Sequence, residues 1–547
     1  MKPIMMMRKM GLAAMALLLL GGNAPAQTGG VRQGAAQKDA AQQYGPLRPG
    51  VPQRVDMQWW QDSHYGLFLH MGLYTVAGGE WKGKGGFGEF IQLNNKIPVA
   101  EMREEAKRFN PVQFDANEWV AAARRAGMKY IVMGSKHHEG FAMFDSPCND
   151  FNVVKATPFG RDIIGELAAA CQRQGMPFGV YYSLGRDWDD PDCPSNWPRE
   201  GGRSNDWDYP NERAKEFSRY FERKAMPQVL ELLRQYPNIS ILWFDTPGYC
   251  SPEQSQRMID TIQKYRPGCL INDRVGNGLG DFITPEQTVS GGLDPDPWES
   301  CITIGSSWGY TKRDTVFKSP EIVARLLTDI VSKGGNLLLN IGPTPWGTFP
   351  EKAVANLDAV GRWLGTNGEA VYGTRPWRVY GESFVREKIG GKTGAENPDE
   401  VKDETAKGTE PDIRFTKKDN VVYVFARSWK APAVRVHRNH LAQLAFDRTH
   451  VHHHLLVVHA VEGLDGHQRN GVGGGGQHHE VRLGDALFER HHAVRQPQLQ
   501  GFGGVFFGVL HPAYLLREFV VAQGQGERAS DEAHARNQYF HSGYTYL

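Results

Sequence analysis

The sequence predicts an α/β protein, a (β/α)8-like TIM barrel followed by a C-terminal β-sandwich domain that is truncated or corrupted. Between residues 53 and 372, short apolar runs of strand length alternate with amphipathic stretches of helical length. From residue 373 the helical stretches stop and strand-length pieces follow one another. Near residue 430 the amino-acid composition changes abruptly. These three observations divide the chain into a barrel, the start of a second domain and a tail.

The overall composition is that of a globular protein. The 547 residues are 40% hydrophobic and 22% charged, and the formal net charge is +1. Such a chain is not a disordered polyelectrolyte, a collagen-like fibre or a multi-span membrane protein. A charge near zero gives no general attraction to nucleic acid or to an anionic membrane. We therefore expect no nucleic-acid partner; the oligomeric state is not indicated.

The first 26 residues have the features of a secretory signal peptide. Lys2, Arg8 and Lys9 form a positive start, residues 10–20 are apolar, and small residues precede Gln27. The apolar run is too short for a stable transmembrane helix. We expect cleavage of residues 1–26, a secreted or periplasmic protein with no membrane attachment afterwards, and a flexible lead-in over residues 27–52.

Six apolar runs between residues 53 and 372 are expected to form the parallel strands of the barrel. They lie at residues 66–70, 130–133, 178–183, 239–244, 269–272 and 336–341. The expected helices are residues 116–126, 162–174, 211–235, 251–265, 319–333 and 351–367. At least six β-α units favour a closed barrel over an open doubly wound sheet. No strand is followed by G-x-G-x-x-G or a P-loop, so a nucleotide site is not expected.

The end of the chain falls into two parts. Residues 373–430 are predicted to begin an appended β-domain, with strands at 377–379, 413–416 and 421–425; the family resemblance given below implies that this domain is a β-sandwich. Residues 431–547 contain 15 of the 19 histidines and no Lys, Trp, Met, Cys or Ile. A metal-binding tract is one interpretation, but the histidine spacing is irregular. The loss of five residue types at once indicates a reading-frame shift near residues 427–431, and hence a disordered tail without a selected function.

Polar residues follow five of the predicted strands, at the end of a barrel where functional groups gather. They are His70, residues 136–139, Arg186 with Asp187, Asp245, and residues 272–274. One such residue alone is more often a helix cap than a catalytic group. Five sets that converge on one barrel mouth indicate a functional site.

The residue types at this mouth favour a sugar-processing site. No G-x-S-x-G is present for serine hydrolysis, and the six widely spaced cysteines have no zinc pattern. His137 and His138 are adjacent on an extended segment and face opposite sides, which disfavours a metal shared with His70. Carboxylates, imidazoles and many tryptophans remain. Such groups suit a sugar ring, and glycoside hydrolysis requires two carboxyl groups.

Nine segments form a pattern that is specific in combination. They are residues 64–72 (HYGLFLHMG), 80–81 (EW), 136–141 (KHHEGF), 243–245 (WFD), 272–274 (NDR), 284–286 (TPE), 298–301 (WESC), 307–310 (SWGY) and 333–343 (KGGNLLLNIGP). The sequence thereby resembles the α-L-fucosidases of glycoside hydrolase family 29, from about residue 57 to 377 with fragments to about 425. The resemblance implies a retaining exo-α-L-fucosidase (EC 3.2.1.51) that removes terminal α-L-fucose from glycans and needs no metal or organic cofactor.

The resemblance also implies catalytic roles. Asp245 would be the nucleophile that forms a covalent fucosyl–enzyme intermediate, and a second carboxyl group would protonate the leaving oxygen and then activate water. Glu286 and Glu299 both match motifs and both stay open as this acid/base, with a slight preference for Glu286. Glu80 is a third, weaker candidate.

The implied substrate-binding residues surround the same sugar ring. They are His70, Glu80, Trp81, His137, His138, Tyr182, Arg274, Trp298 and Trp308. The three histidines would donate hydrogen bonds to fucose hydroxyls, and the last two tryptophans would contact the C6 methyl group. Two rival interpretations remain, namely a related barrel glycosidase acting on fucose-containing polysaccharide and a catalytically dead secreted carbohydrate-binding protein. Linkage preference is not indicated.

Overall fold

A curled sheet of seven parallel strands forms the centre of the protein. The computed structural model describes residues 55–85, 88–194, 202–382, 413–419 and 421–426, and separate strands between 435 and 522. The seven strands are β1 (Tyr65–Leu69), β4 (Tyr130–Lys136), β5 (Phe178–Ser183), β6 (Ile239–Asp245), β7 (Leu270–Ile271), β8 (Glu299–Thr303) and β9 (Asn336–Ile341). Their spatial order is β7–β6–β5–β4–β1–β9–β8, and all pairs are parallel.

A loop segment closes the barrel where an eighth strand would lie. Strands β7 and β8 are the two edges of the sheet. Single parallel bridges join Asn272 to Phe282, Ile283 to Trp298, and Glu286 to Cys301. The backbone between residues 282 and 287 therefore spans the gap, and Glu286 stands at the end of this segment on the mouth side.

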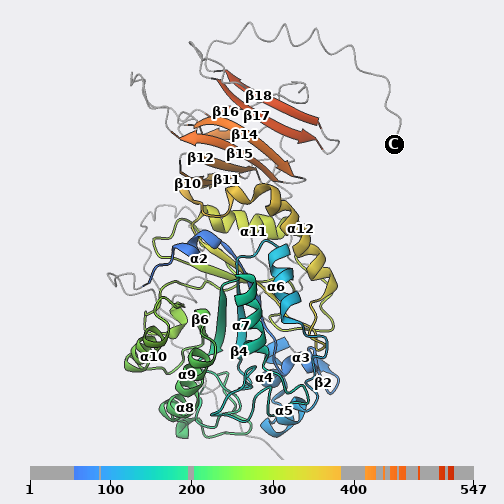
Figure 1. Ribbon diagram of the computed structural model, residues 1–547, viewed down its shortest axis with the longest axis vertical. Coiled ribbons are helices and arrows are strands. Elements are labelled where there is room, and N and C mark those ends of the chain that lie inside the picture. Colours follow the sequence, from blue (N-terminus) through green and yellow to red (C-terminus); the bar gives the residue numbers. More distant parts are fainter. Residues whose placement is uncertain are drawn as a thin grey trace, which may run out of the picture.

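Helices cover the outside of the barrel (Figure 1). The helices are α2 (Gln58–Ser63), α3 (Tyr74–Ala77), α4 (Ile91–Asn95), α5 (Val99–Ala106), α6 (Ala116–Arg125), α7 (Ile163–Gln174), α8 (Phe217–Tyr220), α9 (Met226–Gln235), α10 (Pro252–Tyr265), α11 (Pro320–Ser332) and α12 (Glu351–Asn367). Four of them begin where a side chain accepts a backbone N–H, at Asp115, Asp162, Ser251 and Ser319. These caps place the helix starts beside the strand ends, at the mouth. No helix among the described residues is long and apolar enough to cross a membrane.

The predicted barrel is confirmed, with two differences in its elements. All six predicted runs form strands, but β8 was missed because Glu299, Ser300 and Thr303 interrupt its apolar residues. The single helix expected over residues 211–235 is instead α8, a π-helical turn at Phe221–Ala225, and α9. The short helices α3, α4 and α5 and the hairpin of β2 (Glu80–Trp81) and β3 (Lys84–Gly85) follow β1 at the mouth.

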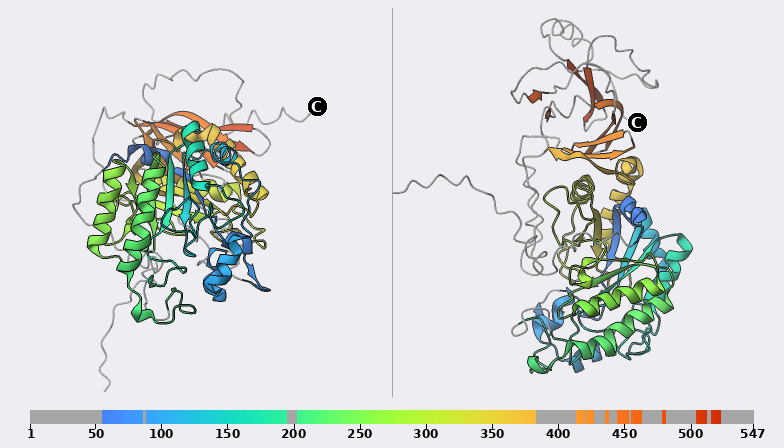
Figure 2. Two further views of the ribbon diagram at one scale, coloured as in Figure 1. Left: turned by 60° about the horizontal axis from the view of Figure 1, so that its bottom comes forward. Right: turned by 90° about the vertical axis from the view of Figure 1, so that its left-hand side faces the viewer.

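An antiparallel sheet packs on the end of the barrel opposite the mouth. Its strands are β10 (Arg375–Glu382), β11 (Ile413–Lys418), β12 (Val421–Ala426), β14 (Leu444–His452) and β15 (Leu455–Glu462), in the order β10–β11–β12–β15–β14. Arg414 of β11 bonds to Asp329 near the end of α11 at 2.5 Å, and Thr416 bonds to the Ala370 carbonyl just after α12. Figures 1 and 2 show this sheet beyond α11 and α12, far from α3, α4 and α5.

Strands also occur within residues 431–547, where a disordered tail was expected. Besides β14 and β15, they are β13 (Arg435–His437), β16 (His478–Glu480), β17 (Gly504–His511) and β18 (Leu515–Ala522). The longer ones are rich in Val, Leu and Phe, which favour extended backbone whatever the origin of the sequence. The disordered tail and the reading-frame shift both stay predictions. The expected signal peptide and lead-in, residues 1–52, lie outside the described residues.

Candidate active site

Three hydrogen-bond donors hold the carboxylate of Asp245 at the C-terminal end of β6. Its Oδ1 accepts from Arg274 Nη1 at 2.8 Å and from the backbone N–H of Thr246 at 2.8 Å. Its Oδ2 accepts from the Tyr181 hydroxyl at 2.9 Å. Thr246 has a left-handed backbone (φ 49°), a conformation that residues other than glycine rarely adopt. The carboxylate is thus fixed in orientation, with its side chain 12% exposed.

Arg274 joins Asp245 to Glu286. The same Nη1 that bonds to Asp245 lies 3.0 Å from Glu286 Oε2. One oxygen of each carboxyl group contacts this nitrogen. Asp245 Oδ1 and Glu286 Oε2 are therefore no farther apart than the 2.8 and 3.0 Å contacts laid end to end. Arg274 is itself fixed by the hydroxyl and carbonyl of Thr284, each at 3.0 Å, and lies over the Trp243 ring. Glu286 is half-buried, so its carboxyl group is reachable from the mouth.

Tyr181, and not Tyr182, faces the site from β5. Alternate residues of a strand face opposite sides, and Tyr181 pairs in register with Trp243, two residues before Asp245. Tyr182 points the other way and donates to Gln228 in α9 at 2.8 Å. The prediction for Tyr182 is therefore wrong by one residue. The side-chain alternation along residues 178–183, anchored at Asp245, would have identified Tyr181.

A chain of hydrogen bonds fixes the tautomer of His70. The Trp308 carbonyl can only accept, so the Asn340 amide Nδ2 donates to it at 2.8 Å. Asn340 Oδ1 then faces His70 Nδ1 at 2.7 Å and accepts its proton. Burial lowers the pKa of His70 to about 4, so the ring is neutral. His70 Nε2 is consequently an acceptor, which differs from the expected donor role.

Protein groups engage both ring nitrogens of His138. Arg186 can only donate, and its Nη1 lies 3.2 Å from His138 Nε2. His138 Nδ1 therefore carries the proton and donates to the Ser183 hydroxyl at 2.7 Å, which in turn donates to the Arg186 carbonyl. His138 Nε2 is also 3.8 Å from Asp245 Oδ2. In this arrangement His138 orients Arg186 and holds no free N–H for the sugar.

His137 lies between the other two histidines and stacks on Tyr181. The His137 ring is 5.3 Å from the Tyr181 ring at 18°, and 5.4 Å from the His70 ring. Burial lowers the pKa of His137 well below 6.5. The structure thus brings His70, His137, Tyr181 and Asp245 together in one buried cluster.

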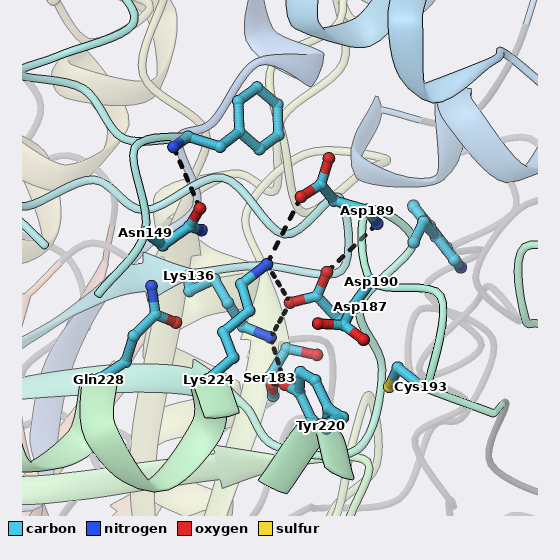
Figure 3. Close-up of polar contacts among 12 residues, drawn as sticks. Lys136, Asn149, Ser183, Asp187, Asp189, Asp190, Cys193, Tyr220, Lys224 and Gln228 are labelled. Carbon is cyan, nitrogen blue, oxygen red and sulfur yellow. Dashed lines mark hydrogen bonds and ion pairs between the residues drawn. The ribbon is translucent and has the colours of Figure 1, made fainter. Parts of the chain in front are cut away.

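A buried ion network anchors the histidine turn from behind. Figure 3 shows the ammonium groups of Lys136 and Lys224 converging on the carboxylate of Asp187, at 3.0 and 2.8 Å. Although burial opposes its charge, these two cations hold the pKa of Asp187 below its usual value. The Trp188 backbone N–H donates to the His138 carbonyl at 2.7 Å. Residues 136–139 are thereby tied to the segment that follows β5.

Glu299 lies at the opposite end of the barrel from Asp245. It is the first residue of β8 and is fully buried. The indoles of Trp60 and Trp243 donate to it at 3.2 and 3.0 Å, and the Tyr130 hydroxyl forms a third, shorter bond. Burial raises the pKa of Glu299 to about 7. The structure does not bring this carboxyl group to Asp245, and Trp243 stands between them.

The two tryptophans expected at the methyl group are placed differently. Trp308 lies in the buried cluster, with its ring 5.1 Å from His70 and 6.0 Å from Phe68. Trp298 directly precedes β8 at the closed end of the barrel, where a Cβ at Gly335 would collide with its indole. Trp298 is therefore a core residue. It directly precedes Glu299, the first residue of β8, and so lies at the same end of the barrel.

Glu80 and Trp81 lie in the hairpin beside the mouth. Glu80 pairs with Arg313 at 3.2 Å, with its side chain 42% exposed, and Trp81 is half-buried. Within the described residues neither side chain bonds to Asp245 or to the three histidines. The structure leaves them at the rim of the site.

Glu89, a buried carboxyl group at the mouth, lies in none of the motifs recognised in the sequence. Glu89 Oε2 accepts from the Gly309 backbone N–H at 2.9 Å and from the Ser307 hydroxyl at 3.2 Å. Burial raises its pKa. It ties the turn at Gly88–Phe90 to the loop that carries Trp308. Only the segment's closeness to the EW motif could have suggested it.

The arrangement is suited to displacement at a sugar carbon. An oriented carboxylate and a second carboxyl group flank one arginine, and neutral imidazoles and aromatic rings line the remaining wall. A separation this short is that of retaining glycosidases, in which the carboxyl groups are about 5–5.5 Å apart. No cluster of three or more potential metal ligands occurs in the part of the chain that the structure describes.

Comparison with known proteins agrees with this chemistry. Residues 32–369 match the family model for α-L-fucosidase. The tissue α-L-fucosidase of Homo sapiens is 30% identical over 378 residues, covering 64% of this chain and 77% of the human protein. The structure of α-L-fucosidase AlfC from Lactobacillus casei with α-L-fucose is 39% identical, with a TM-score of 0.55 over 57% of this chain and 100% of that one. The structure of an α-L-fucosidase from Vibrio sp. strain EJY3 is 26% identical, with a TM-score of 0.63 over 86% of this chain and 71% of that one. The chain belongs to the α-L-fucosidase family.

Proposed function

We propose that this protein is a glycoside hydrolase that removes terminal α-L-fucose from glycans with retention of anomeric configuration. The observation that carries the proposal is the shared contact of Arg274 Nη1 with Asp245 and Glu286. It sets two carboxyl groups at the short separation that a double displacement requires. We assign Asp245 as nucleophile and Glu286 as acid/base.

The proposed reaction has two steps. In the first, Asp245 attacks the anomeric carbon of fucose while Glu286 gives its proton to the departing glycosidic oxygen. An ester bond to Asp245 forms as the glycosidic bond breaks. In the second, ionised Glu286 takes a proton from water, whose oxygen displaces Asp245 and releases fucose. Arg274 and Tyr181 hold Asp245 in place through both steps.

Substrate recognition in this proposal uses the buried cluster around His70 and Trp308. His70 Nε2 accepts from one fucose hydroxyl, and Trp308 and Phe68 offer an apolar wall for the C6 methyl group. A methyl contact contributes about 1–3 kcal/mol, which is enough to favour fucose over a sugar whose group at C6 does not fit this wall. Fucosylated glycans are the substrate class. Fucose-containing polysaccharide is not favoured by any feature of the described residues.

The assignment of the acid/base is tested by chemical rescue. Glu286→Ala should lower the hydrolysis of an unactivated fucoside by roughly 10²–10⁴-fold. With an activated aryl fucoside and azide, the variant should recover rate and yield α-fucosyl azide, because azide replaces water in the second displacement. Asp245→Ala should abolish hydrolysis while the protein stays folded.

Glu299→Ala is the matched comparison. Its carboxyl group is buried among Trp60, Tyr130 and Trp243, so the variant should lose thermal stability and gain nothing from azide. Rescue of Glu299→Ala and not of Glu286→Ala would overturn the assignment.

Export from the cytoplasm belongs to the same proposal. The positive start, apolar run and small residues before Gln27 support a signal peptide. N-terminal sequencing of the protein recovered from the medium or periplasm tests it. A mature chain that begins near Gln27 is the expected result.

A further inference from the structure

Glu139 is a buried carboxyl group behind His137 that the proposed mechanism does not use. Its side chain is 1% exposed. Its Oε1 accepts the Leu73 backbone N–H at 3.3 Å. A Cβ at residue 72 would lie 2.2 Å from the same oxygen, so Gly72 provides the space for this carboxyl group.

Unpartnered polar atoms face one another between Glu139 and His137. Glu139 Oε2 and His137 Nδ1 are both buried and without a hydrogen-bond partner, and they lie 3.7 Å apart. The hydroxyl of Tyr74, whose ring is 5.4 Å from His137, is also unpartnered. Buried polar atoms without partners are unfavourable. A small rotation of the carboxyl group would bring Oε2 and Nδ1 into contact and satisfy both.

The surroundings keep Glu139 and His137 neutral. Burial raises the pKa of Glu139 to about 8 and lowers that of His137 well below 6.5. The charged groups nearest Glu139 are Lys136 and Asp187, which pair with each other (Figure 3). Tyr74 and the backbone N–H groups of Leu73 and of Glu139 itself also face the carboxyl group. Lys136 lowers the pKa of Glu139 and Asp187 raises it, and burial has the largest effect, so the pKa stays above its usual value.

We infer that protonated Glu139 donates a hydrogen bond to His137 Nδ1 and so fixes the His137 tautomer that carries its proton on Nε2. Nε2 then donates to a hydroxyl of bound fucose. Because His70 Nε2 is an acceptor, the pair offers one donor and one acceptor to the sugar. Glu139 is thus a positioning residue that acts through His137, and the inference rests on the proposed function.

The inference predicts a specific loss of fucose binding at alkaline pH. An ionised Glu139 can only accept, so it draws the proton to Nδ1 and removes the donor at Nε2. In calorimetric titrations with L-fucose, wild-type affinity should fall about tenfold between pH 7 and pH 9.5, the effect of one hydrogen bond. Glu139→Gln keeps a donor that does not titrate. It should bind within about threefold of wild type at pH 7 and show no alkaline loss.

Further variants separate this role from a merely structural one. Glu139→Leu has no donor. At every pH it should bind L-fucose about tenfold more weakly than wild type binds it at pH 7. Glu105→Gln removes another buried carboxyl group, on α5, and should follow wild type throughout. An alkaline loss in Glu139→Gln equal to that of wild type, or wild-type affinity in Glu139→Leu, would overturn the inference.

Histidine nitrogen shifts provide a readout that does not depend on fucose. The His137 signal, identified by its absence in His137→Ala, should show the Nε2–H form in wild type and in Glu139→Gln. It should show a tautomer mixture in Glu139→Leu. The same spectrum in all three would overturn the inference. If wild type neither hydrolysed an aryl fucoside nor bound fucose, the proposed function would fail, and these shifts would still test the bond.

Discussion

At the scale of single residues, one position along β5 separates Tyr181, a hydrogen-bond partner of Asp245, from Tyr182, which bonds to Gln228 in the core. Tyr181→Phe removes a hydrogen bond to the charged Asp245 and should lower kcat by about 10–100-fold. Tyr182→Phe leaves the Gln228 oxygen unpaired and should cost about 1–3 kcal/mol of stability with little change in kcat. Aryl-fucoside kinetics and thermal melts check both variants. A larger kcat effect in Tyr182→Phe would contradict this register.

Glu299 should make stability depend on pH. Burial raises its pKa to about 7 from an ordinary 4.5, so folding favours the protonated form. The stabilisation that Glu299 gives through this pKa shift is therefore complete below about pH 4.5. It is lost progressively as the pH rises through about 7, and the free energy of unfolding then no longer depends on Glu299 ionisation. Glu299→Gln cannot ionise, so its free energy of unfolding should not show this loss. The stability difference between wild type and Glu299→Gln should therefore shrink as the pH rises from about 5 to 8. Denaturant unfolding measures this, with exposed Glu118→Gln as a control whose difference stays constant. A constant difference for Glu299→Gln would contradict the expectation.

The polar residues of the motifs were largely predictable, and their partners were not. Asp245, Arg274 and the three histidines follow strand ends, where a barrel presents its functional groups, and the structure brings them together. The donor or acceptor role of His70 depends on Asn340 and Trp308, far along the chain. Such roles follow from three-dimensional contacts and leave no local signal.

At the scale of elements, the contact between α11 and β11 should govern stability without affecting catalysis. Arg414 pairs with Asp329, which also binds Lys333, and all three are buried. Arg414→Leu leaves Asp329 partly uncompensated and should destabilise the protein by about 3 kcal/mol. Since this contact lies opposite the mouth, kcat/KM should not change.

The control for this element is an exposed ion pair. Arg257→Ala breaks the pair with Glu222 on the surface and should change stability by no more than about 0.5 kcal/mol. Chemical denaturation and aryl-fucoside kinetics compare the variants. A fall in kcat/KM for folded Arg414→Leu would show coupling between the sheet and the site.

Closure of the barrel illustrates why some elements escape prediction. The segment 282–287 has only single bridges to its neighbours, and β8 begins with polar residues. Neither shows the apolar run by which a buried strand is identified. The folded barrel explains both segments. Glu299 accepts hydrogen bonds from buried side chains inside the barrel, and Arg274 contacts Glu286 at the mouth.

At the scale of the whole molecule, the antiparallel sheet and the site lie at opposite ends (Figure 1). A chain that stops after residue 426 would expose the edge of β12 and apolar surface, which favours aggregation. Its monomeric fraction should nevertheless keep the kcat/KM of the full chain. Light scattering and kinetics on the separated monomer check this. Loss of activity in that monomer would contradict it.

The reading-frame prediction is tested on the gene itself. Resequencing codons 420–440 should reveal an insertion or deletion near residues 427–431. An intact frame there would reject the prediction, and the strands described between 435 and 522 would then be a native part of the second domain.

The sequence by itself determined the barrel, the residues at its mouth and the break in composition near residue 430. Apolar periodicity and short motifs are local properties, so one chain is enough to read them. Only the tertiary structure decided which carboxyl group lies near Asp245, which tyrosine bonds to it, and that His70 Nε2 is an acceptor. These depend on strand parity, on burial and on hydrogen bonds between residues up to 270 positions apart. Such distances close only when the chain folds.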